Sequence, residues 1–337
     1  MTPATTAARA TKPARPISAV TAASNVFVAE HLAAATAVGE RLADLVHDPD
    51  AFAAAITEGF QTLADPAVIA GIHSVAPGLG LVLGVRLPLM EAANKAFKKG
   101  TRQTPTSFLV DAMARLLREE PRELRWFGIW NLARLVPTDP ERTWQLLRRA
   151  AREADEWITV DTLAHPYAEG ILRDPRRWTE LEQLVYSPSR WERRLVGSTV
   201  ATLPHVRAIP GSRDRAVTDH GFALVGELMG DAEPDVQKAL SWALRTLADL
   251  DRAATTRFLE AETQIARQTS DGHRAWVIRD SVSKLSVEKA NRLKTSLDGI
   301  RRHPAAAATS RAASAAAQFA TIGASGFLPR AATALEE

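Results

Sequence analysis

The hydrophobic pattern between about residues 25 and 300 is helical almost throughout. Apolar residues recur at spacings of three and four, which places them on one face of a helix, and no stretch alternates as a strand does. Pro, Gly and Asp residues separate these stretches and mark where helices end. The pattern therefore predicts an all-α fold without a sheet. The clearest periodic stretches are EHLAAATAVGERLADLV, TSFLVDAMARLLREE, RTWQLLRRAAREA, DRAVTDHGFALVGELM and RAWVIRDSVSKL.

A weak internal repeat runs through the middle of the chain. The segments 119–135, 155–168, 187–203 and 233–247 resemble one another, and several of them open with Pro or an acidic residue. Their first apolar residues, at 124, 157, 191 and 236, are 33, 34 and 45 residues apart. These are the periods of two-helix units such as HEAT repeats. We therefore expect a HEAT-like superhelix, an α-solenoid whose concave wall takes one helix from each repeat.

The two ends of the chain differ from this periodic region. Residues 1–24 are rich in Ala, Thr and Pro and contain basic but no acidic residues. Because they lack a continuous apolar stretch, we expect a flexible basic tail and not a secretory signal; an organellar transit peptide is the alternative. Residues 301–337 are Ala-rich and of low complexity, so we expect a second, disordered tail. The helical domain would then span residues 25–300.

Composition narrows the chemistry of the chain. Cysteine is absent, which excludes disulfides, thiolate catalysis and Cys-bearing metal sites. The net charge is +3 and the pI is about 9.4, with far more Arg than Lys. Arg is suited to bidentate phosphate contacts, so local Arg clusters favour a nucleic-acid surface, although a GC-rich genome would produce the same bias. The most apolar run, residues 79–90, is too short to span a membrane, and no H-E-x-x-H or P-loop motif is present.

The stretch DEWITVDTLAH contains the most informative pair of residues. Trp157 and Asp161 are four residues apart, so they share one face of a helix, as do Trp242 and Arg245 three residues apart. Trp rings, a carboxylate and guanidinium groups together suit a flat cationic ligand beside a polyanionic backbone, such as an alkylated purine in DNA. The alternatives are that the Trp residues belong to the core and that Asp161 is the structural partner of an Arg.

Four stretches in sequence order carry a resemblance to a known family. They are GVRLPLMEAANKAFKKG, the Trp157–Asp161 pair, WERR at 191–194 and QKALSWALR at 237–245; HRAWVIRDSVSKL follows them. Over about residues 30 to 290 the chain resembles the AlkD-type DNA alkylation repair glycosylases, which are HEAT-like superhelical proteins. The resemblance implies that Asp161 is the catalytic carboxylate and that Trp157 and Trp242 form aromatic walls. The DNA-binding residues that we expect are Arg193, Arg194, Arg245, Arg125 and Lys238, with Arg193 and Arg194 as alternatives for one phosphate-contacting position.

The activity implied by this resemblance is hydrolysis of the N-glycosidic bond of N3- or N7-alkylated purines in duplex DNA, without extrusion of the base. Such purines are cationic and leave readily, so a carboxylate that stabilises the oxocarbenium sugar and orients water is sufficient. We expect a cytoplasmic, nucleoid-associated monomer without metal or organic cofactor. A catalytically silent DNA-binding relative and a protein-binding scaffold are the rival functions. Trp130 could be a core or a groove residue, and His165, four residues after Asp161, could lie on the same face.

Overall fold

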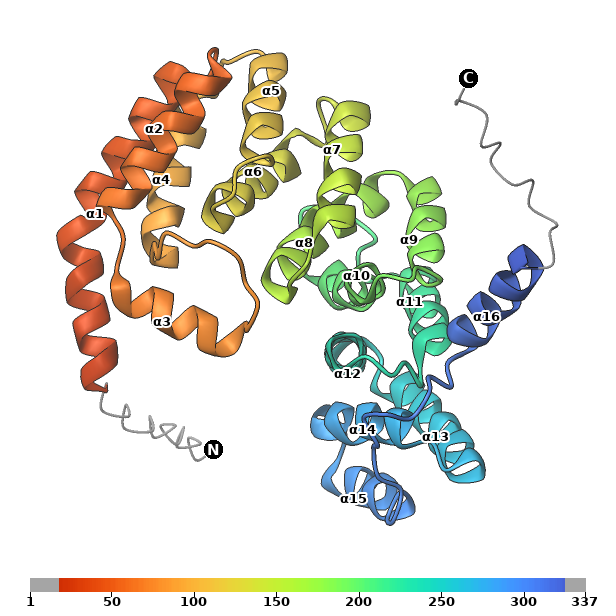
Figure 1. Cartoon of the computed structure of the whole chain (residues 1–337). Coiled ribbons are helices and arrows are strands. Elements are labelled where there is room, and N and C mark those ends of the chain that lie inside the picture. Colours follow the sequence, from red (N-terminus) through yellow and green to blue (C-terminus); the bar gives the residue numbers. More distant parts are fainter. Residues whose placement is uncertain (1–17, 325–337) are drawn as a thin grey trace, which may run out of the picture.

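The computed structural model describes residues 18–324, and within this range the chain is all-α (Figure 1). It contains sixteen α-helices, three short 3-10 helices and no strand in these residues; Ala64 and Val85 form an isolated bridge. The predicted fold class is confirmed. None of the helices that the structure describes is long and apolar enough to cross a membrane.

The first four helices form one arm of the molecule. Helix α1 packs against both α2 and α4, whereas α3 contributes no fully buried residue and lies along the inner side of the arc (Figure 1). Asp48 and Asp65 begin α2 and α3 by accepting hydrogen bonds from backbone N–H groups, and each is followed by a Pro that suits the first helical position. The bounds are α1 Ala19–Leu45, α2 Pro49–Thr62, α3 Pro66–Val75 and α4 Leu87–Gly100.

The next ten helices form the predicted repeat. Inner helices α6, α8, α10, α12 and α14 pack each on the next, and outer helices α5, α7, α9, α11 and α13 each pack on the inner helix that follows. The apolar residues at 124, 157, 191 and 236 fall in the first turns of four consecutive inner helices, so the sequence repeat matches a structural one. The inner helices are α6 Arg122–Leu135, α8 Trp157–Arg173, α10 Arg190–Thr202, α12 Pro234–Leu250 and α14 Gly272–Ser281; the outer helices are α5 Thr106–Leu116, α7 Pro140–Glu153, α9 Trp178–Leu184, α11 Arg215–Leu228 and α13 Arg252–Thr269.

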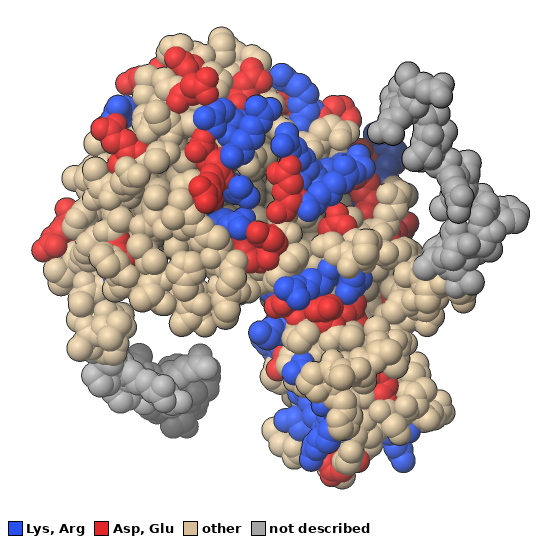
Figure 2. Space-filling model, viewed as in Figure 1, with Lys and Arg blue, Asp and Glu red and all other residues tan. Residues whose placement is uncertain are grey.

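These helices follow an arc that leaves a hollow between α3 on one arm and the α12–α15 region on the other (Figures 1 and 2). The close approach of α10 to α12 depends on Gly197, because a Cβ atom there would lie 2.9 Å from the Cβ of Ala239. A continuous core of buried apolar residues runs through the repeat. The 3-10 helices Pro175–Arg177, Leu203–His205 and Val282–Lys284 join successive helices.

The chain after residue 300 differs from the expected disordered tail. Helix α15 (Val287–Ser296) is followed by a segment whose Thr309 donates its backbone N–H to the Gly230 carbonyl at 2.9 Å, and α16 (Arg311–Ala324) packs on α11. Ser310 is buried, and Arg311 pairs with Glu227 at 3.1 Å. A few polar anchors and small Ala side chains are enough to dock a low-complexity segment. Helix α1 also begins before the expected boundary at residue 25; residues 1–17 and 325–337 of the two expected tails lie outside the described range.

Candidate active site

Three consecutive inner helices contribute to a cluster around Asp161 and Arg194. Asp161 lies in the second turn of α8 and accepts hydrogen bonds from Arg194 Nε at 3.1 Å and Nη2 at 2.8 Å, and from Ser198 Oγ at 2.7 Å. Arg194 and Ser198 are one turn apart on α10, so they approach the carboxylate together. Arg194 Nη1 donates to the Asp235 carbonyl of α12 at 2.8 Å. The carboxylate orientation is therefore fixed by contacts from outside its own helix.

The two charged side chains of this cluster differ in burial: Arg194 is buried, whereas Asp161 is partly exposed. The Arg194 side chain is 7% exposed, whereas the Asp161 side chain is 22% exposed. A carboxylate can accept about four hydrogen bonds, and the protein supplies three. Asp161 therefore keeps acceptor capacity on its exposed side and can contact a ligand while Arg194 holds it.

Trp157 lies at the start of α8 and joins the same cluster. Its Nε1 donates to the Val75 carbonyl at the end of α3, at 3.3 Å, and the Arg194 guanidinium lies 5.8 Å from its ring centroid. The preceding Glu156 begins α8 by accepting from the backbone N–H groups of Ile158 and Thr159, and burial raises the pKa of this carboxyl. The ring is half-buried, so part of an aromatic surface remains available near Asp161.

An open cavity of about 640 Å³ lies beside Asp161, between α4, α6 and α8. Trp130 and His165 both line it, and Trp130 also packs against the core. Lys98 of α4 and Arg134 of α6 line it as well. The cavity thus has the carboxylates of Asp161 and Glu169 on α8 and of Glu91 on α4, together with the cationic groups of Lys98 and Arg134.

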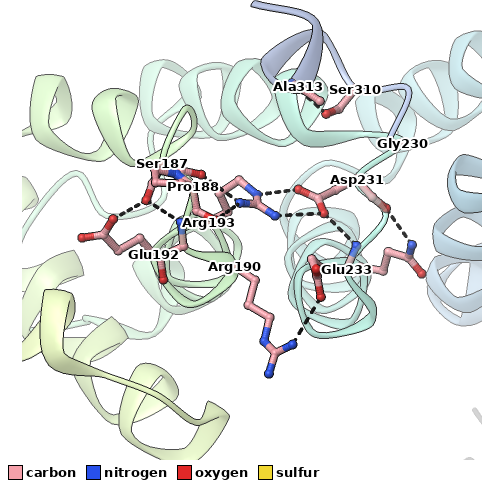
Figure 3. A network of polar contacts seen from close by, with 12 residues as sticks. Ser187, Pro188, Arg190, Glu192, Arg193, Gly230, Asp231, Glu233, Ser310 and Ala313 are labelled. Atoms are coloured by element: carbon pink, nitrogen blue, oxygen red, sulfur yellow. Dashed lines mark hydrogen bonds and ion pairs between the residues drawn. The ribbon is translucent and has the colours of Figure 1, made fainter. Parts of the chain in front are cut away.

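Arg193 points away from this cluster, although it is adjacent to Arg194. Its Nε donates to Asp231 at 2.7 Å, and its Nη1 donates to the carbonyls of Ser187 and Pro188 at 2.8 and 3.1 Å (Figure 3). Asp231 also accepts from the Glu233 N–H at 2.8 Å, so the pair joins the loop before α10 to the loop before α12. Of the two alternatives in WERR, Arg194 is the residue that reaches Asp161.

The remaining expected site residues also lie outside the Asp161 cluster. Arg245 Nη1 pairs with Asp280 of α14 at 2.6 Å; burial opposes ionisation of Asp280, but hydrogen bonds from Ser241 and Arg245 outweigh it and lower its pKa. Arg125 donates to the Glu119 carbonyl, and it lines a small pocket between α6 and α7. Lys238 is exposed on α12, and Trp242 packs half-buried against the core.

Two features of the site were missed by the sequence analysis. Ser198 could have been found from its spacing of four after Arg194, which places both on one helix face. The cations on the α4 side could have been found in AANKAFKKG, where Lys residues are concentrated although Lys is scarce elsewhere. Neither signal indicated that these groups and Asp161 would lie around the same groove, because they come from separate helices.

Comparison with known proteins agrees with the resemblance seen in the sequence. A model of the family described as DNA alkylation repair enzyme matches residues 56–285, from α2 to the end of the inner helices. A comparison with curated proteins finds no match. The matched region includes Trp157, Asp161, Arg194 and Trp242. Because this region is more than half of the chain, the protein belongs to the DNA alkylation repair enzyme family.

Proposed function

We propose that this protein is a DNA glycosylase that removes cationic N3- or N7-alkylated purines from duplex DNA by hydrolysing the N-glycosidic bond. The observation that carries the proposal is the Asp161 carboxylate, which is held by Arg194 and Ser198 yet partly exposed beside an open cavity. Family membership supports a role in DNA repair. The products are the free alkylated base and an abasic site.

Asp161 would act on the sugar. As the glycosidic bond breaks, its electron pair leaves with the purine, and positive charge develops on the deoxyribose. A fixed carboxylate close to the anomeric carbon stabilises that charge and can accept a hydrogen bond from the attacking water. Alkylation already makes the base a good leaving group, so the base requires no proton from a second acid.

Trp157 would position the lesion. Its half-buried ring joins the Asp161 cluster through Arg194, and we assign it to contacts with the deoxyribose and the cationic base, where cation–π attraction contributes roughly 0.5–2 kcal/mol. The site lies on the surface of a groove, and this arrangement supports cleavage without extrusion of the base from the stack.

A silent DNA-binding protein is the second candidate, and one observation favours it. The bidentate pair between Asp161 and the buried Arg194 is also what a purely structural ion pair would look like. In that case the carboxylate would hold α8 against α10 and take no part in chemistry. The two candidates differ in what happens to the base when Asp161 is changed.

The deciding experiment measures base release under single-turnover conditions from duplexes that carry 7-methylguanine or 3-methyladenine. We expect Asp161→Asn to reduce release by about 100-fold or more, the size of effect that follows loss of a fixed electrostatic group. The matched control is Asp219→Asn, which removes a carboxylate from outer helix α11. Release by the wild type that is unchanged in Asp161→Asn would refute the catalytic assignment. Intact bases together with salt-sensitive DNA binding would favour the silent binder, and neither release nor binding would favour a protein scaffold.

A further inference from the structure

A cluster of cations without partners lies on and just after α4. Lys95, Lys98 and Lys99 are spaced by three and four on one face of the helix, and Arg102 follows its C-terminal end. All four line one depression of about 480 Å³, in which the only carboxylate is Glu91. Within residues 18–324 none of these four side chains makes a hydrogen bond or an ion pair. We call this set the α4 cations.

Arg134 of α6 adds a fifth positive charge at the edge of this surface. Its Nη2 donates to Thr101 Oγ1 at 3.1 Å, while its Nη1 is buried without a partner in the described residues. Burial, together with the charge of Arg134, lowers the pKa of Lys98. Two like charges that are partly removed from water and lack an acidic partner are unfavourable in isolation, and an anion between them would relieve both costs.

The α4 cations and Asp161 border one continuous surface. The depression beside the α4 cations and the cavity beside Asp161 share Glu91, Asn94 and Lys98 as lining residues. From Lys95 to Lys99 the helix covers about 6 Å at the helical rise, a length that corresponds to about two phosphates of one DNA strand along the duplex axis; Arg102 follows the end of the helix. Lys is a compact point charge that suits sequence-independent phosphate contact.

We propose that the α4 cations bind consecutive phosphates of the DNA backbone and hold the duplex in the groove that presents it to Asp161. This proposal rests on the proposed function, because it takes the ligand to be the same duplex DNA. The α4 cations then supply the part of the DNA interface that Arg193 and Arg245 do not offer, since those two residues are already bound to Asp231 and Asp280.

The test compares two triple variants that lose equal charge. Lys95→Gln/Lys98→Gln/Lys99→Gln removes three of the α4 cations, whereas Arg142→Gln/Arg149→Gln/Arg176→Gln removes three exposed cations from α7 and the 3-10 helix after α8. Binding to an unmodified duplex of about 20 base pairs is measured against salt concentration. The quantity compared is the slope of the logarithm of the binding constant against the logarithm of the salt concentration. We expect this slope to fall in magnitude by about 2 to 3 in the Lys variant and to match the wild type in the Arg variant.

Two results would overturn the proposal: an unchanged slope in the Lys variant, or equal losses in both variants, which would indicate only a general charge effect. Because Lys98 is half-buried, Lys95→Gln/Lys99→Gln is measured as well, with an expected decrease of about 1 to 2. Base release from a 7-methylguanine duplex is followed in parallel. Base release by the wild type, with slopes that are unchanged in the Lys variants, would reject DNA binding by the α4 cations but not the glycosylase activity. No base release by the wild type, with a slope reduced in the Lys variant only, would reject the glycosylase activity and support DNA binding by the α4 cations.

Discussion

Three arginines of the inner helices α10 and α12 differ from the α4 cations in the presence of an acidic partner. Arg193, Arg194 and Arg245 each meet a carboxylate from another repeat, at 2.6 to 2.8 Å. The α4 cations meet none within residues 18–324. Positive and negative side chains are likewise interspersed on the face of the molecule shown in Figure 2.

Under the proposal, this difference separates cations that position other residues from cations that contact DNA. A cation bound to a buried carboxylate joins two repeats, and removing it leaves a desolvated charge behind. When a cation without a partner binds a phosphate, the protein loses little stability, because no existing ion pair is broken. The following predictions test whether pairing separates positioning cations from DNA-binding cations.

The largest effect is expected for Arg194→Gln. Gln cannot form the bidentate contact, so Asp161 keeps only the Ser198 hydroxyl and loses its fixed orientation. We expect base release at saturating enzyme to fall by about 10- to 100-fold, while the salt dependence of DNA binding stays at the wild-type value. A slope reduced by about 1 with normal release would show that Arg194 contacts a phosphate directly. Arg194→Lys is not expected to restore release, because an ammonium group lacks the planar fork.

The second prediction concerns the stability of the protein and Arg193, the residue next to Arg194. Arg193→Gln breaks the contact to Asp231, whose side chain is 4% exposed, and removes donors to two loop carbonyls. We expect the free energy of unfolding to fall by about 1 to 3 kcal/mol, measured by urea denaturation, with base release unchanged at a temperature well below the midpoint. This variant is the matched control for Arg194→Gln. A large loss of release in a folded Arg193→Gln protein would contradict the separation between the two residues.

The smallest effect is expected at Arg245. The hydrogen bonds that lower the pKa of Asp280 contribute stability that is present above the unfolded pKa of an Asp, about 3.9, and is lost as the pH falls through the lower folded pKa. Because both side chains are partly exposed, Arg245→Gln should cost less than about 1 kcal/mol at pH 7. Unfolding measured at pH 7 and pH 3 should show a smaller difference between variant and wild type at pH 3. An equal difference in the free energy of unfolding at both pH values would exclude ionisation of Asp280 as the cause of the destabilisation.

Much of the fold followed from the sequence because it depends on local features. The spacing of apolar residues predicted the helices, and the repeat of 33 and 34 residues matched the inner helices α6, α8 and α10. The docking of helix α16 on the body of the protein did not follow from the Ala-rich composition of the C-terminal region. The contacts of Thr309 with Gly230 and Asp271 join residues more than thirty positions apart, so an Ala-rich segment gives no local sign of them.

For the candidate site, the sequence determined that Trp157 and Asp161 share one face of a helix, because a spacing of four closes one helical turn. Only the tertiary structure decided that Arg194, and not Arg193, reaches Asp161. Adjacent residues on a helix point about 100° apart, so the choice depends on how α10 lies between α8 and α12. The α4 cations stand close together in the sequence, but their lack of partners and their place beside Asp161 come from packing between helices that are distant in the sequence.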